Sequence, residues 1–371
     1  MKIKSHIREY EVFFEEDDSF LENLEQKKEA FYVIDKTVYE LYSSLFATIP
    51  ANKLYLLEAK EENKVIDIAL DICDHLVSFN AKRNLNLISI GGGIVQDITG
   101  FVANIMYRGI NWIFVPTTLL ASCDSCIGSK TSLNYKKYKN LLGTFFPPSE
   151  IHIFTQFFNT LSEKDFYSGL GEVIKFNIMT GESGLSFLEK NIHNILKKDH
   201  EQLLEVVKRS LAFKQMFIEA DEFDHGERIK LNFAHTFGHS IEVLSSYEIP
   251  HGTAVAIGML MANEISEKRG WLSSDIARRC QSLLLPVIKI DDSFSVLDQP
   301  VEKYLEIIKK DKKQIASAVT AVLIRSFGEH SELIIDHAVD TKEISDAVKK
   351  FLFLYGNQRS LFSNKQEKKN S

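Results

Sequence analysis

A short stretch of the chain carries four polar side chains at helical spacing: Arg228, Asn232, His235 and His239. They fall at i, i+4, i+7 and i+11, so a continuous helix over 228–245 would present them on one face. The residues between them are mostly apolar, which indicates that the helix is buried. Burial of such polar groups is unfavourable unless something satisfies them. A metal ion together with an anionic ligand would do so.

Two residues outside this stretch extend it into a possible metal site. His251 follows the helix, and Glu172 lies upstream in GLGEVIKF, whose apolar residues indicate burial. The spacing of Glu172 and Lys175 is ordinarily that of an exposed i,i+3 ion pair, but a buried carboxylate needs a cation. Three protein ligands with an open position are typical of catalytic zinc, and Glu172, His235 and His251 would supply them. Because Thr236 replaces the glutamate of HExxH, a metalloprotease is disfavoured.

Three glycines at 91–93 end the apolar segment LNLISIGGG and precede a segment of helical period. In such a turn, glycine lets backbone N–H groups approach a pyrophosphate at the helix N-terminus. A tight strand-to-helix turn without a ligand is the alternative. The residues that favour a dinucleotide site are Asp97, Thr117 and Thr118, with Glu61 and Lys64 as candidates for the adenosine ribose.

The segment 123–145 is expected to be a glycine-containing loop that carries Asp124, Lys130, Lys139 and Asn140. It is not a Walker A loop, because that motif needs Gly and Lys side by side. The lysines at 136–137 are interpreted as a solvated bend. The CxxC at 123–126 is interpreted as two small buried residues, since no second CxxC accompanies it.

The elements that would position these residues change character along the chain. In the first half, strands near 10–14, 30–36, 53–59, 85–93 and 111–120 alternate with helices, which predicts a mostly parallel sheet covered by helices. From about residue 155 the segments are helical, and 320–327 is the only strand expected. We expect an α/β dinucleotide-binding domain over 1–155, a mostly helical metal- and substrate-binding domain over 156–356, and a disordered polar tail over 357–371.

Composition argues against several classes of function. The net charge is −7 with both signs interspersed, which disfavours nucleic acid as the main partner. No run of 18 apolar residues is present, so no membrane span is expected, and the N-terminus has no apolar core of signal-peptide length. Four cysteines in 371 residues do not make a disulfide framework, and a cytoplasmic location is expected.

Together these motifs resemble the 3-dehydroquinate synthase family of the sugar-phosphate cyclases. The resemblance runs from about residue 85 to 325 and rests on GGGIVQDITGFVA, YRGI, VPTTLLASCDSCIGSKTSLN, KNLLGTF, LGEVIKF, DEFDHGERIKLNFAHTFGHSIE, HGTAVAIGM and KKDKK. It implies a dehydroquinate synthase-like fold and conversion of 3-deoxy-D-arabino-heptulosonate 7-phosphate (DAHP) to 3-dehydroquinate and phosphate, in the shikimate pathway. It also implies transient oxidation by NAD, phosphate elimination, re-reduction and aldol cyclisation, with Zn²⁺ or Co²⁺ as Lewis acid.

The resemblance further implies roles for individual residues. Lys214 and Arg228 are expected to bind the substrate carboxylate, a pair that favours DAHP over neutral sugar phosphates. Arg108 is expected to reach a neighbouring subunit's site, which implies a homodimer. The metal ligands implied are Glu172, His235 and His251, the catalytic residues are Asp124, Lys130, Asn140, Lys175 and His239, and the other substrate contacts are Asn232 and Lys312. The NAD contacts implied are Asp35, Glu61, Lys64, Gly91, Gly92, Asp97, Thr117, Thr118 and Lys139.

Five positions depart from the family pattern. Gln96 and Ala234 stand where glycine is usual, Ser129 stands in a GGKT-like loop, Phe154 replaces an Asp, and Thr253 replaces the Glu of HGEAV. The change at 253 alters a possible partner of the third metal ligand, which would weaken zinc binding. These departures leave room for a related cyclase of secondary metabolism that acts on another heptulose or hexose phosphate. A polyol dehydrogenase and a silent NAD-binding protein are the remaining alternatives.

Overall fold

The computed structural model describes residues 1–289, 299–310 and 319–367 of the chain. It divides into two compact units, each of which is discontinuous in sequence. The first unit comprises Met1–Gly169 and Asn194–Arg228, and the second comprises Leu170–His193 and Ile229–Ser371. Residues 194–228, which the sequence assigned to the helical domain, therefore pack with the sheet-containing unit.

The first unit contains a seven-stranded sheet in the order β1-β2-β9-β6-β5-β3-β4. Neighbouring strands are parallel except for β1 and β2. Strands β5 and β6 are buried on both faces, as central strands of a parallel sheet are. The expected mostly parallel sheet is confirmed. The strands are β1 (Lys2–Ile3), β2 (Tyr10–Glu15), β3 (Ala30–Asp35), β4 (Leu54–Leu57), β5 (Asn86–Gly91), β6 (Asn111–Pro116) and β9 (Glu150–Phe154).

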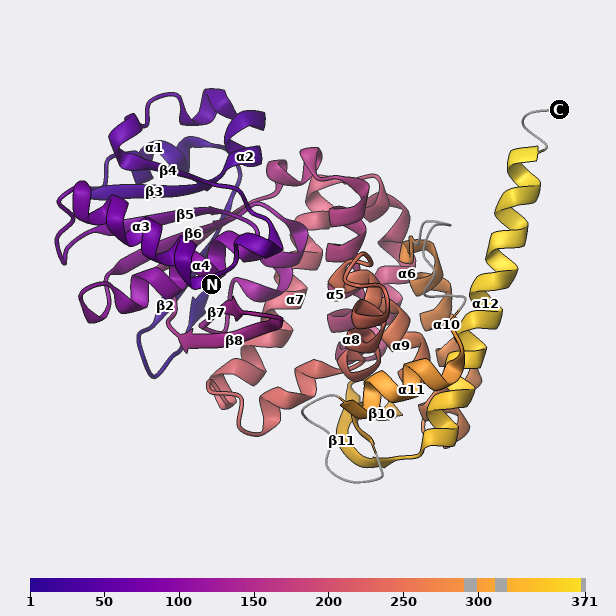
Figure 1. Ribbon diagram of the computed structural model, residues 1–371. Coiled ribbons are helices and arrows are strands. Elements are labelled where there is room, and N and C mark those ends of the chain that lie inside the picture. Colours follow the sequence, from indigo (N-terminus) through magenta and orange to yellow (C-terminus); the bar gives the residue numbers. More distant parts are fainter. Residues whose placement is uncertain (290–298, 311–318, 368–371) are drawn as a thin grey trace. The chain divides into compact units, whose positions relative to one another are not determined.

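Helices cover this sheet, and α4 (Gly93–Ile105) begins directly after β5 (Figure 1). Its residues Val95, Ile98 and Val102 recur at helical period and are fully buried. Gly92 is the residue before the helix, with extended backbone. The turn and helix that the three glycines predicted are therefore present. The other α-helices that lie wholly in this unit are α1 (Ser19–Glu25), α2 (Lys36–Leu41), α3 (Ile66–Ser78) and α7 (His200–Ala220).

The expected loop over 123–145 is wrong. A π-helical turn over Ala121–Ser125 leads into an antiparallel hairpin of β7 (Lys130–Tyr135) and β8 (Tyr138–Phe145). Thr131 and Leu133 alternate with more exposed neighbours at the start of β7, which is the strand period. The many lysines and asparagines of the segment hid this pattern. The bend at 136–137 is confirmed as solvated, since both lysines are exposed and Lys136 has φ 55°.

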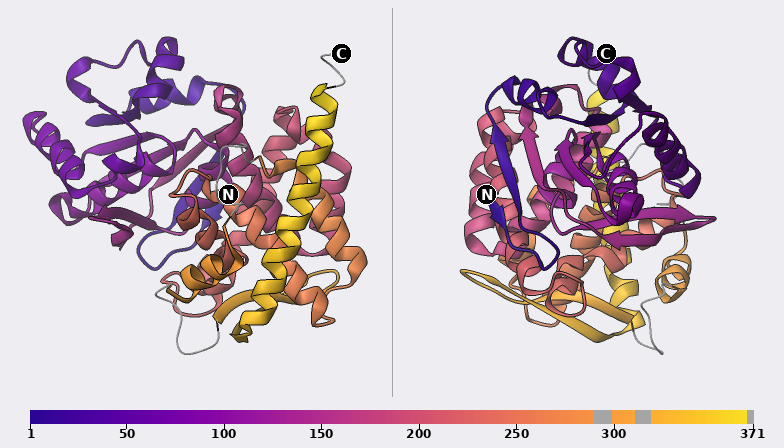
Figure 2. Two further views of the ribbon diagram at one scale, coloured as in Figure 1. Left: turned by 45° about the vertical axis from the view of Figure 1, so that its right-hand side comes forward. Right: turned by 90° about the vertical axis from the view of Figure 1, so that its left-hand side faces the viewer.

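The second unit is mostly helical, with α9 (His251–Lys268) buried on nearly every side. Helix α12 (Thr341–Glu367) packs along α9 (Figure 2). It continues past residue 357, where the sequence predicted a disordered tail, and its residues from 357 on include neither Gly nor Pro. Strand β11 (Ser331–Val339), which pairs with β10 (Val319–Phe327), was not expected, since most of its residues are partly or fully exposed and do not alternate regularly. The other helices are α5 (Glu163–Thr180) and α6 (Glu182–Leu196), which both cross the unit boundary, α8 (His235–Leu244), α10 (Ser274–Leu284) and α11 (Val301–Lys310).

The continuous helix expected over 228–245 is also wrong. A 3₁₀-helix spans Glu227–Asn232, and Ala234 then adopts a left-handed conformation with φ 69° and ψ −14° before α8 begins at His235. A 3₁₀-helix has about three residues per turn, and the left-handed residue redirects the chain. The four polar residues therefore do not form one helical stripe. Arg228 belongs to the first unit, whereas Asn232, His235 and His239 belong to the second.

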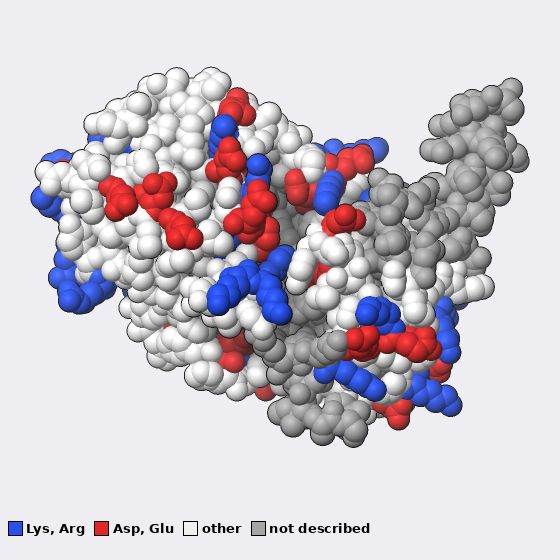
Figure 3. Space-filling view, viewed as in Figure 1, with Lys and Arg blue, Asp and Glu red and all other residues white. Residues whose placement is uncertain are grey.

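The surface and the cysteines agree with the composition. Among the described residues, no helix combines the length and the apolar character needed to cross a membrane. On the face drawn in Figure 3, basic and acidic side chains are intermixed. All four cysteines are free. Cys123 and Cys126 are buried, and burial raises the pKa of the Cys126 thiol to about 12, so the structural interpretation of the CxxC fits.

Candidate active site

Three predicted metal ligands meet in the second unit. Glu172 lies in α5, while His235 and His251 are the first residues of α8 and α9. The Oε1 atom of Glu172 lies 3.4 Å from Nε2 of His251 and 3.7 Å from Nε2 of His235. Ligands at about 2.1 Å from a tetrahedral zinc ion are about 3.4 Å apart. The three side chains thus have the chemistry and nearly the spacing of a zinc site.

Close backbone approaches bring these helices together. A Cβ atom on Gly171 would lie 2.5 Å from the carbonyl carbon of Gly252, so α5 and α9 can approach this closely only with glycine there. Gly171 and Gly252 immediately adjoin the ligands Glu172 and His251. Likewise, a Cβ on Gly258 of α9 would lie 2.8 Å from the amide nitrogen of Gly238 in α8. The two glycine contacts therefore determine where the ligands meet.

The carboxylate of Glu172 is the buried charge that the site must satisfy. It is fully buried, and neither oxygen accepts a hydrogen bond of good geometry from the described residues. Lys175 Nζ lies 2.5 Å from Oε2, so charge rather than a directed bond holds the pair. Burial acts to raise the pKa of Glu172, but the charge of Lys175 and the contact with His251 outweigh it and lower the pKa. An ionised carboxylate without hydrogen bonds fits a metal ion.

Both histidines turn the same ring atom toward Glu172. His235 Nδ1 lies 3.0 Å from the carbonyl oxygen of Phe233, so Nδ1 carries the proton and Nε2 is left with its lone pair. Burial first, and then the charge of Lys175, lower the pKa of His235 well below its usual value, which keeps it neutral. Burial also acts to lower the pKa of His251, but contacts with Glu172 and Glu242 raise it to about 10.

Three cations of the first unit gather near the turn over 121–130. Lys214 Nζ donates to the backbone oxygen of Asp124 at 2.6 Å and to its Oδ1 at 2.7 Å. Arg228 is buried, and its guanidinium donates to the carbonyl oxygens of Gly128, at 2.8 Å, and of Glu222. Burial first, and then the charges of Arg228 and Lys214, lower the pKa of Lys130. Asp224, to which Lys130 Nζ donates at 2.6 Å, acts in the opposite direction. Three cations this close together would stabilise an anionic ligand.

The candidate dinucleotide contacts lie at the carboxyl ends of neighbouring strands. Gly91 ends β5, Thr117 and Thr118 follow β6, and Asp35 ends β3. The β3–β5 and β5–β6 pairs are adjacent in the sheet. Ligands of parallel α/β sheets bind at this edge. Gly92 lies against Thr118, where a Cβ would meet Cγ2 at 3.0 Å.

The remaining dinucleotide candidates form one polar cluster beside the hairpin. Lys64, buried, forms an ion pair with Asp97 and donates to Oδ1 of Asn140 at 2.7 Å. The Nζ atom of Lys139 lies 3.7 Å from Oε1 of Glu61. Asn140, expected at the reacting centre, thus lies beside the candidate NAD contact Lys64. The sequence pattern missed Ser132 and Asn134, which hydrogen-bond to Asp97 and Glu61 respectively.

The departures from the family pattern have local explanations. Gln96 and Ser125 exchange two hydrogen bonds, one from Gln96 Nε2 to the backbone oxygen at 2.7 Å and one from Ser125 Oγ to Oε1 at 2.6 Å. This pair ties α4 to the π-helical turn. Ser129 and Ala234 have φ 66° and 69°, in the region that favours glycine. Phe154 is buried against Phe20 and Phe157, and Thr253 is buried in the first turn of α9.

The other predicted residues are less enclosed. Asn232 is half-buried and the side chain of His239 is 41% exposed. Arg108 is exposed with φ 61°. Lys312 lies outside the described residues. Glu242, which contacts His251, was missed, although it stands seven residues after His235 on the same helical face.

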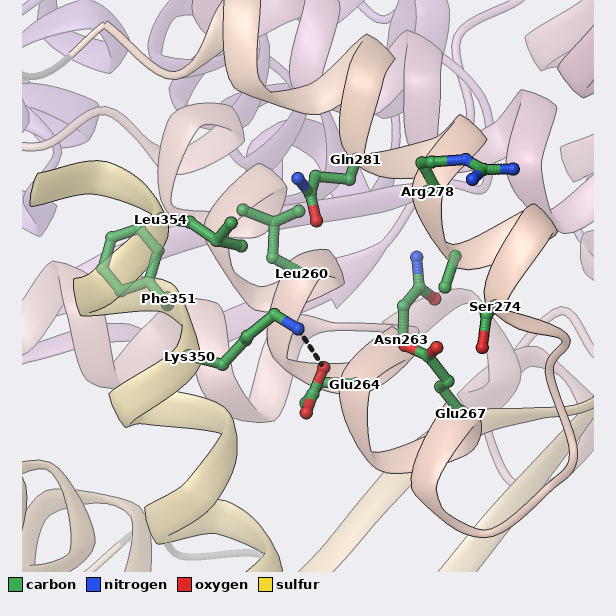
Figure 4. A pocket seen from close by; sticks show the side chains of 11 residues that line it. Leu260, Asn263, Glu264, Glu267, Ser274, Arg278, Gln281, Lys350, Phe351 and Leu354 are labelled. Atoms are coloured by element: carbon green, nitrogen blue, oxygen red, sulfur yellow. Dashed lines mark ion pairs between the residues drawn. The ribbon is translucent and has the colours of Figure 1, made fainter. Parts of the chain in front are cut away.

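A pocket elsewhere in the second unit is lined by α9, α10 and α12 (Figure 4). It holds Asn263, Gln281 and the ion pair of Lys350 with Glu264, whose charged atoms are 3.6 Å apart. None of the predicted site residues lines it.

One unit thus has a mostly parallel sheet with a glycine turn before a helix, and the other has a Glu-His-His set whose carboxylate is fully buried. These are features of a metal-dependent enzyme that binds a dinucleotide. Residues 54–168 match the family model described as 3-dehydroquinate synthase N-terminal, and residues 169–314 match the one described as 3-dehydroquinate synthase C-terminal. The chain belongs to the 3-dehydroquinate synthase family.

Curated relatives are named 3-dehydroquinate synthase. A 3-dehydroquinate synthase from Dictyoglomus turgidum is 37% identical over 86% of this chain and 88% of its own length. Another, from Dictyoglomus thermophilum, is 35% identical over 94% and 97%. A third, from Clostridium tetani, is 40% identical over 70% of each chain. The expected family and enzyme identity are confirmed, and the alternative of a sister cyclase is not favoured.

Solved structures show the same fold. A 2-epi-5-epi-valiolone synthase from Streptomyces hygroscopicus subsp. jinggangensis, with NAD⁺ and Zn²⁺ bound, has a TM-score of 0.79 at 24% identity, covering 92% of this chain and 96% of that one. A 2-deoxy-scyllo-inosose synthase complexed with carbaglucose-6-phosphate, NAD⁺ and Co²⁺ has a TM-score of 0.77 at 19% identity, covering 94% and 99%. The expected dehydroquinate synthase-like fold class is confirmed.

Proposed function

We propose that this protein converts DAHP to 3-dehydroquinate and phosphate, using NAD and a divalent metal ion, Zn²⁺ or Co²⁺. The observation that carries the proposal is the Glu172–His235–His251 set, built around a fully buried carboxylate, in a chain of this family. NAD supplies reversible oxidation of a substrate hydroxyl, and the metal ion supplies Lewis acidity at the oxygen atoms that change charge. The metal ligands we assign are Glu172, His235 and His251.

Residues of the first unit are proposed to bind NAD at the carboxyl edge of the sheet. The start of α4 offers backbone N–H groups to a pyrophosphate beside Gly91 and Gly92. The cluster around Lys64 and Asp97 is proposed to orient the nucleoside part. The NAD contacts assigned are Asp35, Glu61, Lys64, Gly91, Gly92, Asp97, Thr117, Thr118 and Lys139.

The cations of the first unit are proposed to bind the anionic substrate. Lys214 and Arg228 are assigned to the carboxylate, and two backbone carbonyls hold the guanidinium in place. Lys175, whose Nζ lies 2.5 Å from Oε2 of Glu172, is assigned to the reacting centre. The other catalytic or phosphate-binding residues assigned are Asp124, Lys130, Asn140, Asn232, His239 and Lys312.

Phosphate release from DAHP tests the reaction. At substoichiometric NAD, we expect many turnovers per NAD, no net NADH accumulation, and loss of activity with a chelator. Net NADH formation would instead identify a dehydrogenase. Turnover of sedoheptulose 7-phosphate or glucose 6-phosphate without turnover of DAHP would identify a sister cyclase and refute the assignment.

We further propose a homodimer in which Arg108 reaches the partner's site, and a cytoplasmic location. The exposed position of Arg108 and the four free cysteines support these proposals. A mixture of Arg108→Ala with an inactive Lys175→Met variant tests the shared site. If the arginine acts across subunits, mixed dimers regain activity that neither variant has alone. A mixture that stays inactive, although its subunits exchange, would contradict the proposal.

A further inference from the structure

We propose that Glu242 of α8 is a positioning residue of the metal centre, which holds His251 through Nδ1 so that Nε2 faces Glu172. The inference rests on the proposed role of Glu172, His235 and His251 as metal ligands. It gives a role to the residue that closes the motif at 221–242, to which none was assigned from the sequence.

The ring of His251 lies between two carboxylates. Its Nδ1 is 3.3 Å from Oε2 of Glu242, and its Nε2 is 3.4 Å from Oε1 of Glu172. An imidazole that binds a metal ion coordinates it through one nitrogen and keeps a proton, which it can donate, on the other. An ionised carboxylate can only accept, so the contact with Glu242 places the proton on Nδ1 and leaves Nε2 for the metal ion.

The same arrangement occurs at His235 with a different acceptor. There the backbone oxygen of Phe233, 3.0 Å from Nδ1, sets the tautomer, and Nε2 again faces Glu172. Both ring ligands are thus oriented from behind by an oxygen atom. At His251 that oxygen is charged, and a carboxylate partner also raises the basicity of a histidine ligand.

Helix packing fixes the distance between Glu242 and His251. Helices α8 and α9 approach closely where Gly258 lies against Gly238, one turn before Glu242. The side chain of Glu242 is only 12% exposed. Thr253, where the family has glutamate, was expected to deprive His251 of a partner. In this chain the neighbouring helix α8 places a carboxylate, that of Glu242, 3.3 Å from Nδ1 of His251.

A direct metal ligand is the competing role for Glu242. Ligand atoms of His239, Glu242 and His251 also lie within 4.8 Å of one another. This second set is more open, since the side chain of His239 is 41% exposed. Glu172 is fully buried and accepts no hydrogen bond from the described residues, so it is the carboxylate that requires the ion.

Zinc affinity of the metal-free, full-length protein tests the proposal, measured by competition with a chromophoric chelator. Glu242→Met keeps the size of the side chain and removes the acceptor, and we expect zinc binding about 10- to 100-fold weaker. Glu242→Gln keeps an acceptor oxygen and should show a smaller loss. Glu248→Met, the matched control, removes an exposed acid in the following loop and should leave the affinity unchanged.

Two further measurements separate positioning from other roles. Long-range ¹H–¹⁵N correlation of zinc-loaded protein should show a hydrogen-bonded, slowly exchanging Nδ1–H proton of His251 in the wild type, and an upfield shift or exchange loss of that signal in Glu242→Met. A purely structural role would leave the Nδ1–H signal unchanged. Glu172→Gln provides the reference for ligand loss. If Glu242→Gln weakens zinc binding as much as Glu172→Gln, Glu242 is a ligand and the proposal fails.

Other outcomes are equally decisive. Unchanged zinc affinity in Glu242→Met would overturn the inference while leaving the metal site intact. Absence of zinc binding by the wild type would instead refute the proposed function. If Glu242→Met does not fold, as judged by urea denaturation with chelator present, Glu242→Gln decides. A smaller loss of zinc affinity than that of Glu172→Gln, with the Nδ1–H signal of His251 retained, supports an acceptor role, and a loss equal to that of Glu172→Gln contradicts it.

Discussion

The ion pair of Glu172 and Lys175 should be strongly coupled, although its i,i+3 spacing is that of weak surface pairs. The exposed fractions of the two side chains are 0% and 2%, and their charged atoms are 2.5 Å apart. Lys303 and Glu306 in α11 form a matched control at the same spacing, 3.2 Å apart, with exposed fractions of 49% and 47%. The two pairs differ chiefly in burial.

Replacing Lys175 by Met leaves a buried carboxylate without its main countercharge. Breaking such a pair costs about 3–5 kcal/mol of the free energy of unfolding. Because His251 Nε2 remains 3.4 Å from the other oxygen of Glu172, we expect the lower limit, about 3 kcal/mol. Adding Glu172→Gln removes the unpaired charge, so the double variant should lose much less than the sum of the two single variants.

Urea denaturation in the presence of a chelator measures this double-mutant cycle. We expect a coupling energy of about 3 kcal/mol for the buried pair and below about 0.5 kcal/mol for Lys303 and Glu306. Equal coupling in the two pairs would refute the reasoning. If Lys175→Met does not fold, the double variant must still fold, and its failure would also contradict the electrostatic explanation.

The pH dependence of stability provides an independent check that the charges of Glu172 and Lys175 stabilise the folded protein. The folded protein holds the pKa of Glu172 below the ordinary value of 4.5. The ionised carboxylate therefore stabilises the folded protein at pH values above its ordinary pKa. This stabilisation is lost as the pH falls through the lowered pKa of Glu172 in the folded state. Without Lys175 the pKa of Glu172 rises, so in Lys175→Met this carboxyl takes up a proton as the pH falls and its burial costs less. The difference in the free energy of unfolding between wild type and Lys175→Met should therefore decrease as the pH falls from 7 to 4. A gap that widens would exclude this mechanism.

Three further substitutions test the geometry. Gly171→Ala places a methyl group against the backbone of Gly252, so α5 and α9 must separate. Zinc affinity should then fall about 10-fold or more. The control Gly328→Ala, where a Cβ meets nothing within 4 Å, should leave zinc affinity unchanged. Gly128→Ala combines φ 103° with a clash against the Arg228 guanidinium, and should destabilise the protein by about 1–3 kcal/mol in urea denaturation. Arg228→Ala should reduce kcat/KM far more for DAHP than for an analogue without the carboxylate, and equal losses would contradict its assigned role.

Much of the fold follows from local patterns in the sequence. The apolar segments that became β3, β5 and β6 are buried on both faces, and such strands predict a parallel sheet without knowledge of their neighbours. The candidate metal ligands were likewise recognisable, because Glu, His and His with apolar neighbours are residue types that a catalytic zinc site uses. Strands β7 and β11 were not predicted, since their polar or exposed residues weaken the alternation.

The arrangement within the site was decided by tertiary contacts. The stripe expected from Arg228 to His239 assumes one uninterrupted helix, whereas the left-handed Ala234 breaks it. The sequence by itself determined which residues could bind a metal ion, through their chemistry and their burial. Only the packing of α5, α8 and α9 at their glycines decided that Glu172 meets both histidines and that Glu242 lies behind His251. Helical period describes neighbours along one helix, but distances between helices depend on contacts from residues far apart in the chain.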